Sequence, residues 1–187
     1  GVLIGPSLDG VLAAEGHGAA AQSNLAVGGS TAAQWNAGTF GDMATLLSGD
    51  PDVELVHVTV GGNDLLGGGL ADPINTLNQA IADAVGVLHD VVAATSASVL
   101  FTGYDYLAQV PAGTTPGLVN FFLDSFVNGV AAQVAASGTL SSQVTVLNTH
   151  GLMQVHFGVP QNGIPAFDPS LPDASLPKQG PGRSSGG

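Results

Sequence analysis

The sequence predicts an α/β fold with a five-stranded, mainly parallel sheet and helices on both faces. Short apolar runs of strand length recur along the chain, and longer segments with apolar residues at three- and four-residue steps lie between them. Strands that alternate with helices imply βαβ crossovers, which make neighbouring strands parallel. In sheets of this kind, functional residues gather at the carboxyl ends of the strands.

Continuous apolar runs are typical of strands that are buried on both faces of a sheet. The five runs that predict strands here are Val2–Ile4, Asn24–Val27, Glu54–Val60, Ser98–Thr102 and Val144–Asn148.

Two segments between these strands carry clear helical periodicity. The first is Ile74–Val92, which Asp72 precedes as a predicted N-cap and Pro73 as a first-turn proline. The second is Leu118–Ala136, with large apolar residues at four-residue steps. Weaker patterns predict helices at Gly10–Ala20 and Thr31–Leu47.

A length of 187 residues predicts one domain with a sizeable core. We assign this domain to residues 1–157. Residues 158–187 are rich in proline and glycine and predict an irregular segment with a flexible tail. Because no helical pattern follows the fifth strand, the domain is expected to end irregularly or to be cut short.

The charge balance restricts the partners. Two basic residues stand against 14 acidic ones, giving a formal net charge of −12, and both basic residues (Lys178 and Arg183) lie near the end of the chain. Such a chain cannot neutralise phosphates, which excludes nucleic-acid binding and disfavours anionic membranes and anionic substrates. No uninterrupted apolar run reaches the roughly 18 residues that span a bilayer, so no stable membrane insertion is expected. A neutral small molecule is the expected substrate.

Three strings of small and polar residues follow the first three predicted strands. Ser7 lies in a turn after the first, Gly28 and Gly29 follow the second, and Asn63 and Asp64 come after two glycines at the end of the third. Each string alone is explained by an N-cap, a tight turn or an Asx-turn. Because carboxyl ends of parallel strands meet at one edge, the three together predict a site there.

These strings, "VLIGPSLDG", "NLAVGGST" and "VTVGGNDLL", resemble in this order the first three blocks of the GDSL/SGNH hydrolases, a superfamily of serine esterases and lipases. "VLFTGYDYL" also resembles the fourth strand of that family. The resemblance covers roughly residues 2–150. It implies a flavodoxin-like three-layer α/β/α fold and the hydrolysis of neutral carboxylic esters, such as acyl esters or acetylated sugars.

Carried over residue by residue, the resemblance implies that Ser7 is the nucleophile. It also implies an oxyanion hole made of the Ser7 and Gly29 backbone N–H groups and the Asn63 side-chain amide. Donors fixed where negative charge develops are worth several kcal/mol each in the transition state. The two glycines before Asn63 are expected to give room for a substrate carbonyl, and Asp64 to brace the turn.

The sequence departs from the family at two points. Pro6 stands where the first block normally has Asp, which predicts a less well supported nucleophile turn. The late D-x-x-H block, which supplies the base, occurs nowhere in the chain, and three residues after Asp168 stands Leu171. The alternative is therefore a truncated or degenerate member of the fold without a base, inactive or acting as a binding module. For a glycan-binding module, Trp35 is the one tryptophan near a predicted site loop.

A substitute base would have to be one of the five histidines. His156 follows the fifth strand on the correct side of the sheet, and Asp168 could orient its ring, so these two residues are the predicted base and its partner. His150 is the next candidate. The other three have structural interpretations: His57 lies inside a strand, His89 inside a helix and His17 in a loop.

No cofactor or metal is predicted. The histidines are scattered without the H-x-x-x-H or H-E-x-x-H spacing of zinc sites, and the chain has no cysteine. The first strand ends in G-P-S-L, which is not the G-x-G-x-x-G string of dinucleotide-binding folds.

Overall fold

The computed structural model of the chain describes residues 14–16, 23–49, 52–67, 72–104, 114 and 116–150. The chain divides into two compact units, Gly1–Ser30 and Thr31–Gly187. The second unit contains every helix and strand that is described in full. The predicted boundary at residue 158 lies outside the described residues.

Three of the five predicted strands form a parallel sheet in the order β1-β2-β3. They are β1 (Leu55–Val58), β2 (Ser98–Thr102) and β3 (Val144–Leu147). Phe101, in the central strand, pairs with Val58 on one side and Val146 on the other. The structure therefore confirms the α/β class and a small parallel sheet.

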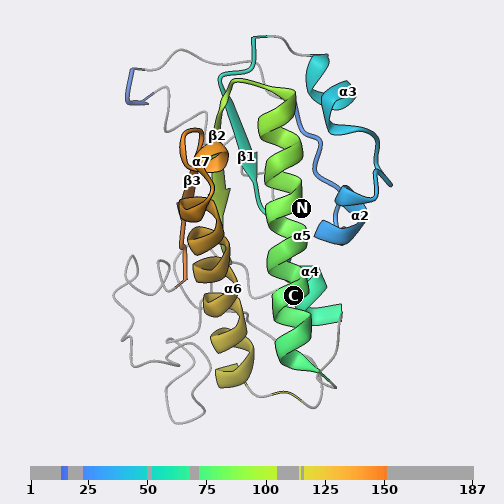
Figure 1. The fold of residues 1–187 in the computed structure, drawn as a ribbon, viewed down its shortest axis with the longest axis vertical. Coiled ribbons are helices and arrows are strands. Elements are labelled where there is room, and N and C mark those ends of the chain that lie inside the picture. Colours follow the sequence, from blue (N-terminus) through green and yellow to red (C-terminus); the bar gives the residue numbers. More distant parts are fainter. Residues whose placement is uncertain are drawn as a thin grey trace. The chain divides into compact units, whose positions relative to one another are not determined.

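The two predicted long helices are confirmed as the crossovers of this sheet (Figure 1). Helix α5 (Pro73–Ala94) connects β1 to β2, and α6 (Pro116–Ala136) with the short α7 (Gly138–Ser141) connects β2 to β3. The predicted cap is present, because the Asp72 side chain accepts a hydrogen bond from the Asn75 N–H at 3.2 Å, with Pro73 in the first turn.

The predicted helix Thr31–Leu47 is wrong in its extent, because the structure has two short helices there. These are α2 (Ala32–Asn36) and α3 (Met43–Ser48). Between them, Gly38 and Gly41 have φ angles of +68° and +115°, which lie outside the helical region. A third short helix, α4 (Gly62–Gly67), begins in the glycine pair after β1, where only a turn was predicted.

The predicted strand Asn24–Val27 is also wrong, because these residues have no strand pairing in the structure. The Asn24 side chain instead accepts a hydrogen bond from the Ala26 N–H at 3.0 Å. Such a local bond offers the backbone an alternative to a ladder. The predicted strand Val2–Ile4 lies outside the described residues, as does most of the predicted helix Gly10–Ala20.

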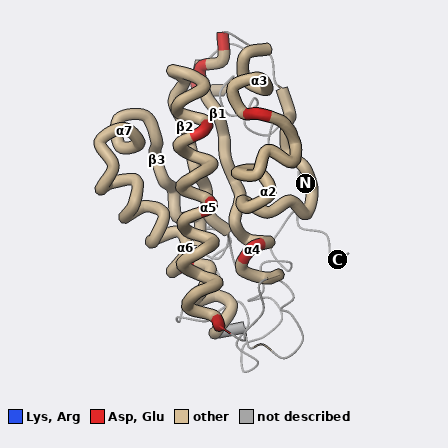
Figure 2. The backbone as a smooth tube through the Cα atoms, turned by 45° about the vertical axis from the view of Figure 1, so that its right-hand side comes forward, with Lys and Arg blue, Asp and Glu red and all other residues tan. Residues whose placement is uncertain are grey.

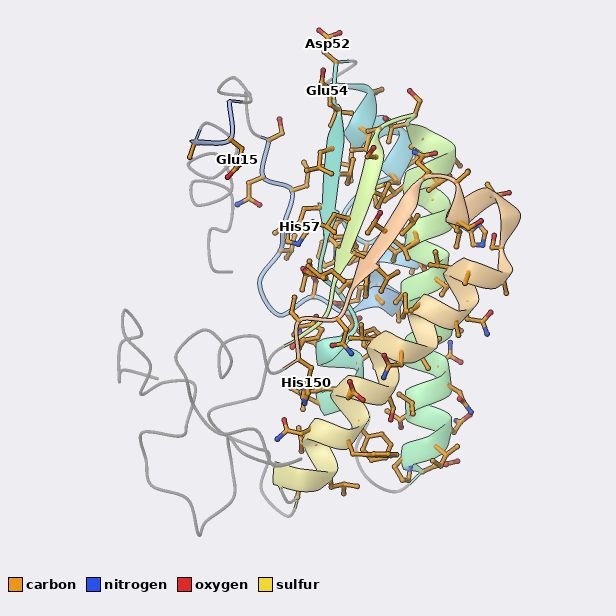
Figure 3. The ribbon with its side chains drawn as sticks, turned by 90° about the vertical axis from the view of Figure 1, so that its left-hand side faces the viewer. Glu15, Asp52, Glu54, His57 and His150 are labelled. Carbon is orange, nitrogen blue, oxygen red and sulfur yellow. The ribbon has the colours of Figure 1, made fainter. Side chains whose placement is uncertain are left out.

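The core lies between the sheet and the helices on one of its faces. Alternate residues of each strand point toward the helices. On this face, Val58, Val99 and Phe101 are buried beneath α5 and α6. The opposite face carries Leu55, His57 and Leu100, which are half-buried or exposed. Figure 3 shows α5 and α6 together on one side of the strands.

Helix α6 contains a stretch, Leu118–Ala136, that is long and apolar enough to cross a membrane by length and composition. Its apolar face is occupied inside the protein, because Phe126, Val127 and Val130 are almost completely buried against the sheet and α5. A core helix of a globular domain can have the same length and composition.

Candidate functional site

The carboxyl ends of the three strands lie at one edge of the sheet, because the strands are parallel. The segments that leave this edge are Thr59–Asp64 after β1, Gly103–Tyr104 after β2 and Asn148–His150 after β3. Figure 3 shows His150 at this end of the sheet and Asp52 and Glu54 at the opposite end. The polar residues at this edge make up the candidate site.

The two glycines before Asn63 serve packing, which corrects the expectation that they make room for a substrate carbonyl. Gly61 has a φ of +102°, and a Cβ at this position would lie 2.2 Å from Phe126 Cζ. A Cβ on Gly62 would lie 2.6 Å from Tyr104 Cζ. Both glycines are buried. Aromatic rings therefore occupy the space that side chains would need.

Asn63 lies at the surface in the first turn of α4, directly after the carboxyl end of β1. The α4 backbone begins with a hydrogen bond from the Leu65 N–H to the Gly61 carbonyl at 3.2 Å. The amide predicted as an oxyanion donor is thus carried by a helical turn that rests on buried glycines. A rigid support of this kind is what a preorganised donor needs.

Asp64 braces the site, as predicted, through a contact with α2. Its two carboxylate oxygens accept hydrogen bonds from the backbone N–H groups of Ala32 at 2.8 Å and Ala33 at 3.2 Å. These are two of the N–H groups in the first turn of α2 that lack a partner within the helix. Thr31 satisfies the next N–H group of this turn, because its Oγ1 accepts a hydrogen bond from the Gln34 N–H. Asp64 therefore joins the GGND turn to the first turn of α2.

Tyr104, two residues after the end of β2, supports the same turn, although the sequence pattern did not single it out. Its hydroxyl oxygen accepts a hydrogen bond from the Gly62 N–H at 3.0 Å. Burial raises the pKa of the Tyr104 phenol, so the group is neutral over the physiological range. The sequence signal that could have identified Tyr104 is its position shortly after the predicted strand in "VLFTGYDYL".

His150 is held at the end of β3 by a network of hydrogen bonds. Its backbone N–H donates to Asn148 Oδ1 at 3.0 Å, and its ring Nδ1 lies 3.3 Å from the Tyr104 carbonyl oxygen. Asn148 in turn donates through Nδ2 to Asp124 Oδ1 on α6 at 2.8 Å. Asn128, also on α6, donates to the other Asp124 oxygen at 3.0 Å. The loop that carries His150 is thereby fixed to α6.

The structure describes only some of the predicted site residues. Asn63 is placed as expected at a strand end, whereas Ser7, His156 and Asp168 lie outside the described residues. Gly29 is described within the first unit, Gly1–Ser30.

Gly29 is the third residue of a turn that the Ser30 N–H closes by donating to the Val27 carbonyl at 3.2 Å. Its φ of +78° is typical of the third position of a type II turn, which favours glycine.

His57 has a structural role on the face of the sheet away from α5 and α6. Its Nε2 is hydrogen-bonded to Thr102 Oγ1 at 2.8 Å, and Thr59 Oγ1 lies 2.6 Å from the same threonine oxygen. Burial lowers the pKa of His57 below its ordinary value of 6.5. This supports the interpretation of His57 as a packed residue.

The lowered pKa of His57 predicts a loss of stability in acid. The unfolded chain protonates His57 near its ordinary pKa of 6.5, whereas the folded chain takes up this proton only at lower pH. The stabilisation is therefore complete above about pH 6.5 and is lost as the pH falls through the pKa of the folded state. We expect the Tm of a His57→Gln variant to change less between about pH 8 and pH 5 than that of the wild type. A His89→Gln variant, altered on the exposed surface of α5, is the control; equal pH dependence in all three proteins would contradict the prediction.

No group of three or more His, Asp or Glu side chains that could hold a metal ion occurs among the residues that the structure describes. Comparisons of the chain with protein families, with curated proteins and with solved structures found no match.

Proposed function

We propose that the chain is a serine hydrolase of the GDSL/SGNH type that cleaves neutral carboxylic esters. The observation that carries the proposal is the support built around the GGND turn. Asn63 is exposed at a strand end on a turn whose glycines pack against Phe126 and Tyr104. Asp64 ties that turn to the α2 backbone directly after the "NLAVGGST" string. These contacts fix the turn that carries Asn63, the residue proposed as the side-chain oxyanion donor.

In the proposed reaction, Ser7 Oγ attacks the ester carbonyl carbon and its proton passes to a base. The carbonyl π electrons move onto oxygen, where the Ser7 and Gly29 N–H groups and the Asn63 amide stabilise the negative charge. Collapse of this intermediate breaks the bond to the alcohol, which leaves with the proton, and gives an acyl-enzyme. Water then releases the carboxylic acid by the same sequence of steps.

The proposal includes the flavodoxin-like layering that the resemblance implies. Purely parallel sheets have both faces covered, and in the described residues α5 and α6 cover one face. We propose that the sheet extends beyond the three described strands and that further segments cover its second face. A fifth strand at Asn24–Val27 is not part of this proposal, because its backbone makes the local contacts described above.

The electrostatics favour a neutral ester. Figure 2 shows Asp and Glu distributed along the described backbone without Lys or Arg, since both basic residues lie outside the described part. The described part therefore has no Lys or Arg side chain that could bind a phosphate or carboxylate of a substrate. Acyl esters and acetylated sugars remain the proposed substrate classes.

A second candidate function is a binding module without catalysis, and the absence of a D-x-x-H string from the sequence favours it. Its glycan-binding form has less support. Trp35 packs against Phe40, with ring centroids 4.8 Å apart, and against the core. The ring is therefore engaged within the protein and is a poor stacking platform for a sugar.

Turnover of p-nitrophenyl acetate and butyrate tests the proposal. We expect Ser7→Ala to abolish turnover and labelling by a fluorophosphonate probe, because the attacking hydroxyl is lost. Asn63→Ala should lower kcat by about 10²–10³-fold, the usual cost of losing one oxyanion donor. Ser98→Ala, at the amino end of β2, is the control and should retain wild-type activity. Wild-type protein without turnover or labelling would favour the binding module.

A further inference from the structure

Four apolar side chains form a surface at the amino-terminal ends of α5 and α6. Ile74 in α5 and Phe121 in α6 are 60% and 61% exposed, more than any other large apolar side chain of the described part. Leu118 is also exposed, and Phe122 is half-buried. Exposed apolar residues that occur singly need no explanation, whereas a contiguous group indicates an interaction site. We call these four residues the helix-end surface.

The packing of the two helices makes this surface continuous. A Cβ on Gly129 would lie 2.4 Å from Ile81 Cδ1, so α6 and α5 touch at these positions. Ile74 and Phe122 lie two helical turns earlier on the same sides of their helices. Both helices begin at the carboxyl end of the sheet and run in the same direction (Figure 1), which places these two residues opposite each other. Phe121 extends the pair, with its ring centroid 5.7 Å from that of Phe122.

The charged side chains of the described part that flank this surface are carboxylates. Asp72, the N-cap of α5, is exposed two residues before Ile74. Asp124 is three residues after Phe121 and is therefore its neighbour on the surface of α6. The Asp124 oxygens accept hydrogen bonds from two asparagine side chains and retain further acceptor positions. No Lys or Arg of the described part neutralises these carboxylates.

This charge decides between the possible occupants of the surface. A second copy of the chain would bring a net charge of −12 to an equally acidic surface, and an anionic lipid surface is repelled in the same way. A neutral lipid surface would cover the apolar side chains but would desolvate the carboxylates without a partner. A cationic amphipathic helix meets both requirements, because its apolar stripe covers the rings while its basic residues lie beside Asp72 and Asp124.

We propose that the helix-end surface binds a cationic amphipathic helix of a partner protein. Phe121, Phe122 and Ile74 are the apolar anchors of this interface. Asp72 and Asp124 pair with Lys or Arg residues beside the apolar stripe of the partner. Aromatic side chains at the centre and charges at the rim are usual in protein interfaces. The proposal is independent of ester hydrolysis, because it uses no residue of the predicted catalytic machinery.

Fluorescence anisotropy with the full chain and a labelled synthetic peptide tests the proposal. The peptide, about 18 residues long, carries Leu on one helical face and Lys on the other. We expect it to bind, and Phe121→Ser to weaken binding by about 10–30-fold, the loss typical of an interface hot spot. Leu147→Ser, at an exposed leucine of β3, is the matched control and should keep wild-type affinity. Absence of binding, or equal affinity in both variants, would overturn the proposal.

The fold of the variants is checked by circular dichroism. Phe121 is mostly exposed, so its replacement should leave the Tm unchanged. Ile74→Ser, on the other helix, provides a second variant, and it should also weaken binding by about tenfold. Wild-type affinity in Ile74→Ser would contradict an interface that spans both helices.

The electrostatic contribution is tested by Asp72→Asn, because asparagine removes the charge and keeps the N-cap. Affinity should fall about 2–5-fold, as expected for a charge pair at an exposed rim, and this loss should disappear at high salt. Asp90→Asn, near the other end of α5, is the control and should have a smaller effect. Equal losses in both variants would show that net charge alone attracts the peptide, which would overturn the proposal.

Two further results would assign the surface to another occupant and overturn the proposal. One is cosedimentation with phosphatidylcholine vesicles that Phe121→Ser abolishes, without binding of the peptide. The other is a dimer in sedimentation velocity that the same substitution dissociates.

Discussion

A Gly61→Ala variant is expected to lose about 3–5 kcal/mol of unfolding free energy, the sum of backbone strain and overpacking. Gly61 has a φ of +102°, where an L-residue is strained. The new methyl group would lie 2.2 Å from Phe126 Cζ. Phe126 cannot retreat easily, because its side chain is fully buried and packs against Phe101 with ring centroids 6.2 Å apart. Urea denaturation of variant and wild type measures the loss.

The matched control is Gly67→Ala, six residues further along the chain at the end of α4. A Cβ on Gly67 meets nothing within 4 Å, and its φ is not positive. Alanine there removes the conformational freedom of glycine in a helix and should be neutral or stabilising by up to about 1 kcal/mol. If Gly61→Ala were as stable as Gly67→Ala, the described packing of Phe126 on the turn would be wrong.

An Asp64→Ala variant is expected to lose about 2–4 kcal/mol, because hydrogen bonds to a charged group are removed and a donor is left without a partner. Ala32 is fully buried, so water cannot readily replace the carboxylate at its N–H. The Tm should fall by roughly 5–12 °C for a chain of this size. Thermal unfolding followed by circular dichroism measures this shift.

Asp90→Asn, on the exposed surface of α5, provides the control for removing one negative charge from an acidic protein. It should change stability by no more than about 0.5 kcal/mol. A fall in Tm of the same size in both variants would show that net charge, and not the contact with α2, determines the effect of Asp64.

Local patterns were sufficient for the elements that the structure confirms. The strands β1, β2 and β3 and the helices α5 and α6 follow from continuous apolar runs and from apolar residues at helical spacing, because each period fixes which side chains face the core. The Asp72-Pro73 start of α5 is equally local. These features depend on neighbours within a few residues, which a sequence displays directly.

The errors arose where a local signal was outweighed or overlooked. The pattern over Thr31–Leu47 favoured one helix, but Gly38 and Gly41 adopt positive φ angles and interrupt it. The apolar run Asn24–Val27 favoured a strand, but Asn24 binds its own backbone. In both cases, residues with a special backbone preference decided the conformation.

The sequence by itself determined that a parallel sheet forms and that Asn63 follows one of its strands. Only the tertiary structure decided why the two preceding glycines are required, since Phe126 and Tyr104 come from other elements to fill their place. It likewise decided that Asp64 binds α2, a contact that spans 32 residues, and that Tyr104 and Asn148 hold His150. Hydrogen bonds and ring contacts between distant segments have no periodicity, so no local pattern predicts them.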